Sequence, residues 1–144
     1  MKNILKLGRW LFASMFAIFG LLHFGPLEFT LDYIPTYLPF PVFWVYFAGV
    51  ALIAFSISAW TGTLDQLAAV LLALMMLSFI LIIHIPRAVE GDFMGILGVF
   101  RDTANLGAAL MYADKYARDN RFVHHLLGFS GSKTSSLTNS TIKS

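Results

Sequence analysis

Four apolar stretches, each about as long as a membrane is thick, are the feature that most limits how this chain can fold. About twenty consecutive apolar residues span the hydrocarbon core of a bilayer. Within that core every backbone polar group needs an internal partner, so stretches of this kind form helices. The sequence therefore predicts an all-α protein, a four-helix transmembrane bundle with helices at about residues 8–24, 42–60, 66–85 and 93–113.

The composition supports a membrane protein and excludes thiol chemistry. Hydrophobic residues make up 58% of the chain and charged residues 12%, against roughly 25% charged residues in a soluble domain. The excess apolar surface is therefore expected to face lipid. There is no cysteine, which excludes a disulfide, a thiolate-bound iron–sulfur cluster and a dithiol redox motif. Any redox electrons would pass through a bound cofactor or a partner. No basic patch typical of nucleic-acid binding is present.

The distribution of lysine and arginine predicts the orientation of the bundle. Basic residues cluster before the first stretch and after the fourth: Lys2, Lys6, Arg9, Lys115, Arg118, Arg121, Lys133 and Lys143. Positively charged flanks stay in the cytoplasm, so both termini are predicted to be cytoplasmic (N-in/C-in). The charged start followed by an apolar run is typical of a secretory signal, but more membrane sequence follows without a convincing cleavage site, so we expect the segment to be retained.

Three segments lie outside the predicted spans. The proline-rich loop 25–41 carries aromatic side chains and is expected to cap the outer mouth of the bundle, or alternatively to anchor it at the interface. Together with the four spans it completes a membrane domain over residues 1–113. Residues 114–129 are expected to form a short basic amphipathic helix on the cytoplasmic side. The Ser/Thr-rich tail, residues 130–144, is expected to be disordered.

Ionisable residues inside the spans are the candidate functional residues, because charge in a membrane is costly and usually functional. With this topology they converge, together with the polar amide of Asn105, on the outer half of the bundle: His23, His84, Arg101 and Asp102. Further contributors are expected just above them at the outer mouth: Glu28, Asp32 and Arg87. Arg101 and Asp102 are sequence neighbours and point apart on a helix. We therefore expect each to find a partner elsewhere, among the histidines, the loop acids, or Asn105 one turn along from Arg101.

Several interpretations of this polar cluster remain open. It could be a clasp that only fixes helix packing, or the same clasp could form a binding pocket. Haem or metal ligation by His23 and His84 is conceivable, but the spacing is not diagnostic and no third ligand is evident, so no metal site is predicted. A histidine beside a quinone carbonyl, able to exchange a proton, is the better redox interpretation.

Three strings of sequence are similar to a known family: LGRWLFASMFAIFGLLHF, PTYLPFPVFWVYFAG and RDTANLGAALMYA. They resemble the first helix, the approach to the second helix and the last helix of the DoxX family of small bacterial membrane proteins. The resemblance implies a four-helix bundle in the bacterial inner membrane with a quinone-linked role, beside other membrane redox subunits or in a homo-oligomer. The family supplies no agreed catalytic residues. The alternatives are an accessory or scaffold subunit without catalysis, and a binder or carrier of a small lipophilic molecule.

Overall fold

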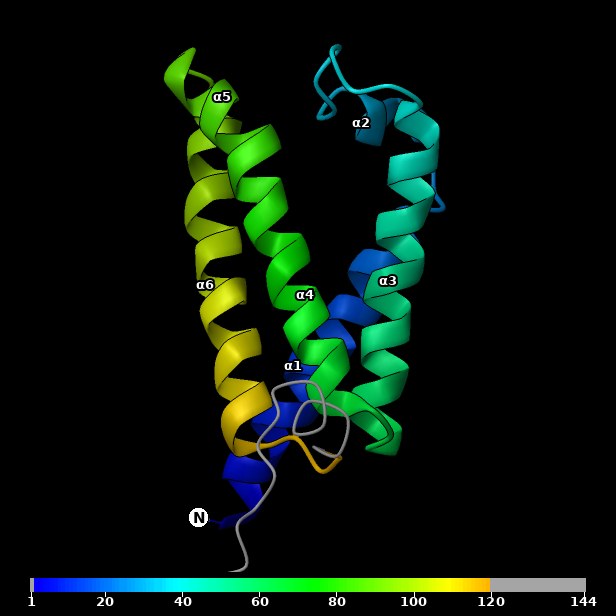
Figure 1. Ribbon diagram of the computed structural model, residues 1–144, viewed down its shortest axis with the longest axis vertical. Helices are drawn as coiled ribbons and strands as arrows, with labels where there is room; N and C mark the ends of the chain where they lie inside the picture. Colours follow the sequence, from blue (N-terminus) through cyan, green and yellow to red (C-terminus); the bar gives the residue numbers. More distant parts are fainter. Residues whose placement is uncertain (1, 120–144) are drawn as a thin grey trace, which may run out of the picture.

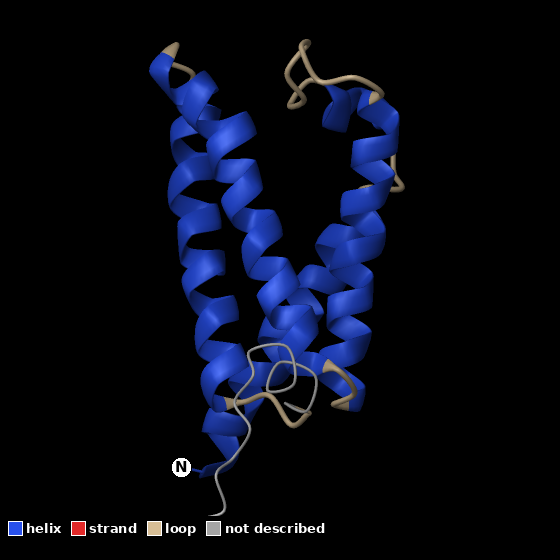
Figure 2. Ribbon diagram, in the orientation of Figure 1, coloured by secondary structure: helices blue, strands red, loops and turns tan. Residues whose placement is uncertain are grey.

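The computed structural model describes residues 2–119, and these form an all-helical protein (Figures 1 and 2). Two long helices come from the first half of the chain, α1 (Lys2–Leu22) and α3 (Pro41–Thr61), with the short α2 (Leu27–Leu31) between them. The second half supplies α4 (Asp65–Phe79), the π-helix η1 (Ile80–His84), α5 (Ile85–Val89) and α6 (Phe93–Lys115). Because α4, η1 and α5 follow one another without a break, the bundle has four long helical rods, which confirms the predicted fold class.

The ends of these rods follow from local backbone chemistry. Helix α3 begins with Pro41, whose missing N–H costs nothing in a first turn, and ends at Gly62, which adopts a left-handed φ of 72°. Asp92 precedes α6, and its carboxylate accepts a hydrogen bond from the Met94 amide at 3.0 Å. Pro41, Gly62 and Asp92 are therefore suited to their positions at these helix ends.

The four rods associate as two pairs, α1 with α3 and α4 with α6 (Figure 1). The pairs lie close together at the end where α1 begins and α6 stops, and they diverge toward the end that carries α2 and α5, here called the α2/α5 end. Near the end where the pairs lie close together, the Phe16 and Phe55 rings meet edge to face, with centroids 5.4 Å apart. Phe55 likewise meets Tyr112 of α6 at 5.8 Å. Among the described residues, aromatic packing thus joins the two pairs near this end.

Close backbone contact holds α1 against α3. A Cβ atom on Gly20 would lie 2.8 Å from the Gly49 carbonyl oxygen, so only glycine permits this approach. The hydroxyl of Ser56, fully buried, donates to the Ala13 carbonyl oxygen at 2.8 Å. Small residues and one internal hydrogen bond therefore set this helix pair.

Two of the rods are long and apolar enough to cross a membrane, Pro41–Thr61 and Asp65–Val89. Much of their apolar surface is exposed, including Phe47 at 52% and Leu71 at 56%. So many large apolar side chains exposed on two long helices are typical of a surface that faces a membrane or a partner. The chain is therefore built as a helical membrane protein.

The segment after the fourth stretch differs from expectation. The predicted helix over residues 114–129 does not continue α6, because α6 ends at Lys115 and residues 116–119 form a turn. The backbone amides of Arg118 and Asp119 bind the carboxylate of Asp65 instead of helix carbonyls, which turns the chain under the start of α4. The remainder of that helix and the predicted disordered tail lie outside the described residues.

Candidate functional site

The π-helix η1 places His84 against α6. A π-turn widens the helix by one residue and shifts the side chains that follow it, and such turns are frequent at functional sites. His84 ends this turn, with the amide of Ile85 bonded back to the carbonyl oxygen of Ile80. The imidazole is only 6% exposed. The π-turn therefore delivers a buried titratable group to the contact between the two helices.

His84, Asp102 and Arg101 form one hydrogen-bonded cluster. Nε2 of His84 lies 3.0 Å from Oδ2 of Asp102, whose side chain is almost fully buried. Nε of Arg101 donates to the other oxygen, Oδ1, at 2.8 Å, and Nη2 of Arg101 lies 3.4 Å from His84 Nε2. Because a carboxylate only accepts, the His84 proton that faces it lies on Nε2.

This geometry corrects the expectation that Arg101 and Asp102 cannot be partners. Their Cβ atoms do point apart, but the long arginine side chain bends back so that Nε meets the neighbouring carboxylate. Asp102 therefore accepts from both Arg101 and His84, while Arg101 stays 53% exposed. The predicted partnership with His84 is present. The cluster combines a buried carboxylate with a cation that reaches the surface of the bundle.

Gly98 makes room for the His84 ring. A Cβ atom at Gly98 would lie 2.2 Å from Nδ1 of His84, far closer than any real contact. Nδ1 is buried and has no hydrogen-bond partner among the described residues. The imidazole is thus pressed against bare backbone on one side and bonded to a carboxylate on the other.

The structure does not bring His23 and Asn105 into this cluster. His23 lies at the end of the other helix pair, where Nδ1 is 2.7 Å from the Phe19 carbonyl oxygen and Cβ packs on Gly49. Asn105 is half-buried on α6 and makes no hydrogen bond to Arg101 among the described residues. Within residues 2–119, no group of three or more His, Cys, Asp or Glu side chains could hold a metal ion.

A second polar cluster lies at the α2/α5 end, where Arg87 meets the loop between α1 and α3. Its Nε donates to Asp92 Oδ2 at 2.6 Å, and Nη1 donates to the Asp32 carbonyl oxygen at 2.9 Å. The guanidinium also lies over the Tyr33 ring, 5.1 Å from its centroid. A polar cavity of about 340 Å³ opens beside these residues. Of the outer-mouth candidates, Asp32 and Arg87 thus meet, whereas Glu28 is exposed on α2.

Two contacts fix the electrostatics and position of this cluster. The Met94 amide and the Arg87 guanidinium both bond Asp92 and hold the pKa of its carboxyl below the usual value. Tyr37 in the loop donates its hydroxyl to the carbonyl oxygen of Ile82 in η1. The loop from one helix pair is therefore tied to the other pair at the end where they diverge.

A third cluster, centred on Asp65, was not predicted from the sequence. Asp65 is fully buried at the first residue of α4. Its carboxylate accepts hydrogen bonds from the Arg118 amide at 2.9 Å, the Asp119 amide at 2.8 Å and the Tyr112 hydroxyl at 3.2 Å. The Arg118 guanidinium donates to the Trp60 carbonyl oxygen at 2.9 Å instead of pairing with that carboxylate. The sequence feature that could have indicated this cluster is an acidic residue at the first position of an apolar span.

The comparisons with known proteins give one match. The sequence model of the DoxX family matches residues 4–85, which run from α1 through the π-helix. This range contains His23 and His84, whereas Arg101, Asp102 and the rest of α6 lie beyond it. No curated protein and no solved structure matches the chain. Since the family match covers more than half of the sequence and the fold is a helical membrane bundle, the chain belongs to the DoxX family.

Proposed function

We propose that this protein is a quinone-binding subunit of a membrane redox system, with the quinone head group held beside Arg101. The observation that carries the proposal is the buried His84–Asp102 pair with a half-exposed arginine bonded to it. In an ion-pair cluster that is only structural, the donors are usually bonded within the protein. Here Nη1 of the Arg101 guanidinium has no partner among the described residues. A free donor on a cation at membrane depth suits a carbonyl oxygen.

Each residue of the cluster has a distinct part in this proposal. Arg101 donates to a quinone carbonyl oxygen and stabilises the negative charge that develops there on reduction. Asp102 fixes the guanidinium and balances its charge. His84 holds a proton on Nε2, beside Asp102 and within 3.4 Å of the arginine. Reduction of a quinone to a quinol takes two electrons and two protons. The electrons would come from a redox cofactor of a partner subunit, and the two protons from water, with His84 relaying them one at a time and being reprotonated after each.

A scaffold role is the second candidate, favoured by the position of the cluster. Asp102 and His84 lie within the contact between α6 and the π-helix η1, and both carboxylate oxygens are already used. In that role the cluster would hold the two helices together and bind nothing. Stability and ligand content therefore separate the two candidates.

The discriminating experiment compares Arg101→Met with a matched charge removal on the same helix, Lys115→Met. Lys115 is exposed and pairs only with its neighbour Asp114 among the described residues. Each protein is purified in nanodiscs, its lipid extract is analysed for quinone, and its unfolding temperature is measured. A quinone site predicts that Arg101→Met loses the quinone and keeps its unfolding temperature, while Lys115→Met keeps both. A wild-type protein without quinone, or an Arg101→Met protein that is strongly destabilised, would favour the scaffold.

The proposal includes a placement in the bacterial cell membrane, with four crossings and both termini in the cytoplasm. The start of α1 and the end of α6 lie at the same end of the bundle (Figure 1), and the basic residues flank that end. Because the chain has no cysteine, single cysteines at Gly8 and Glu28 can be labelled with an impermeant thiol reagent in intact cells. Labelling at Glu28 alone supports the placement, and labelling at Gly8 alone reverses it.

A further inference from the structure

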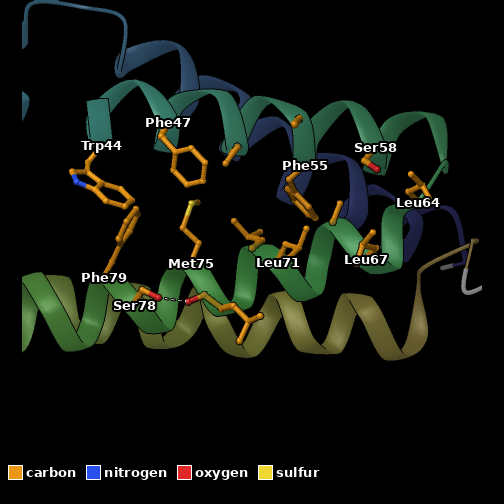
Figure 3. Close-up of a pocket in the computed structure, with 15 residues that line it drawn as sticks. Trp44, Phe47, Phe55, Ser58, Leu64, Leu67, Leu71, Met75, Ser78 and Phe79 are labelled. Carbon is orange, nitrogen blue, oxygen red and sulfur yellow. Dashed lines mark hydrogen bonds between the residues drawn. The ribbon is translucent and has the colours of Figure 1, made fainter. Parts of the chain in front are cut away.

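A cavity lies between α3 and α4, separate from the polar clusters. It measures about 540 Å³, within the range of ligand pockets in proteins. Figure 3 shows its lining, in which Trp44, Phe47 and Phe55 of α3 face Leu71, Met75 and Phe79 of α4. No residue of α6 contributes. The cavity therefore lies on the opposite side of α4 from His84 and Asp102.

The polar groups that line this cavity are already bonded within the protein. Nε1 of Trp44 donates to the Pro39 carbonyl oxygen at 3.0 Å. Ser78 donates to the Leu74 carbonyl oxygen at 2.9 Å (Figure 3), and Ser58 donates to the carbonyl oxygen of Thr63. Ordinary ligand pockets orient a ligand with a few convergent polar groups. This cavity offers no such free donor, so its occupant has no polar group to match.

The shape of the cavity indicates a chain and not a compact molecule. On α3 the lining extends from Trp44 to Ser58, which at 1.5 Å per residue is about 21 Å along the helix. This is roughly two thirds of the hydrocarbon thickness of a bilayer. Residues that line the cavity are also exposed, with Phe47 at 52% and Leu71 at 56%, and both helices that line it are long and apolar enough to span a membrane.

We propose that this cavity binds one acyl chain of a bilayer lipid, lying along α3 and α4 between the two helix pairs. An acyl chain satisfies all three observations: it is apolar throughout, elongated, and present at high concentration on the exposed side. This site does not depend on the proposed quinone site.

The test fills the cavity by substitution and measures bound lipid. Ala54 is exposed and lines the cavity, so Ala54→Phe places a ring inside it. The matched control is Val50→Phe, because Val50 is exposed on the same helix and does not line the cavity. Phospholipid retained by protein released from nanodiscs into mild detergent is counted by native mass spectrometry.

We expect one phospholipid per chain in the wild type and in Val50→Phe, and at least a tenfold loss in Ala54→Phe. If Ala54→Phe fails to fold, Ala51→Leu fills the same cavity with a smaller side chain and serves in its place. A wild type that retains no lipid, a filled variant that retains as much as the wild type, or retention of an isoprenoid quinone instead of an acyl lipid would overturn the proposal. Arg101→Met should keep its phospholipid, so failure of the quinone site leaves this result unaffected.

Discussion

The hydroxyl of Tyr37 donates a hydrogen bond to the carbonyl oxygen of Ile82. In a regular α-helix this oxygen would accept from the backbone N–H of residue 86, which is a proline. Proline has no N–H to offer the carbonyl four residues before it, so a side chain from the loop between α1 and α3 takes its place. This contact supplies the donor that the helix ladder lacks and joins the two helix pairs.

Replacing Tyr37 by Phe should therefore destabilise the protein by about 0.5–1.5 kcal/mol, the net contribution of a typical hydrogen bond, since Tyr37 is 62% exposed. The measurement is reversible unfolding in mixed micelles. Tyr46→Phe is the control, since its ring stacks on Phe24 and its hydroxyl bonds nothing in the described residues. Restoring a backbone N–H with Pro86→Ala should reduce the effect of Tyr37→Phe. An unchanged effect in that background would contradict the assignment.

The fit of His84 against Gly98 gives a second prediction. Gly98→Ala should cost at least about 1–3 kcal/mol, because the added methyl group overpacks the helix contact at the imidazole. Gly107 on the same helix faces open space, with nothing within 4 Å of the point where a Cβ atom would lie. Gly107→Ala should therefore be neutral or stabilising by up to about 1 kcal/mol. Unfolding temperatures of the two variants in nanodiscs decide the matter. Equal temperatures would mean that the His84 ring moves aside freely.

The Asp65 cluster predicts a local loss of structure. Asp65→Ala should destabilise the protein by about 3 kcal/mol, because two backbone amides and the Tyr112 hydroxyl lose a charged acceptor. Cleavage by protease after residue 115 should become faster than in the wild type. Asp114→Ala is the control, since Asp114 is exposed and bonds only Lys115 among the described residues. Similar cleavage rates in both variants would contradict the role given to Asp65.

The acid sensitivity of the α2/α5 end follows from Asp92. Hydrogen bonds from Met94 and Arg87 lower its pKa in the folded protein from the ordinary value of 3.8. A carboxyl group whose pKa is lowered in the folded protein stabilises the fold at pH values above its ordinary pKa. This stabilisation is lost as the pH falls through the folded pKa. The stability advantage of the wild type over Asp92→Asn should therefore be constant near neutral pH and shrink below about pH 4. Unfolding measured across this range checks it, and a difference independent of pH would contradict it.

The sequence was sufficient to predict the helices, because span length and apolar composition alone determine them. It also placed His84, with His23 and the loop acids, among the candidate partners of Arg101 and Asp102. The sequence did not exclude His23 from the cluster. Apolar residues lie on every face of α1 and α3, so their spacing does not show which helices pair. That pairing depends on the backbone contact between Gly20 and Gly49. Neither could it reveal that the side chain of Arg101 bends back to its neighbour, since this depends on rotamers and not on spacing.

The buried carboxylate of Asp65 also bears on the order in which the bundle can be completed. The amides that satisfy it belong to Arg118 and Asp119, 53 and 54 residues further along. In a chain synthesised from its N-terminus, the turn between α3 and α4 is therefore made long before its hydrogen-bond donors exist. Both helices can form, but the carboxylate at their junction lacks these donors until α6 has been made and the chain has turned beneath it. The last described residues thus complete a turn that begins in the middle of the protein.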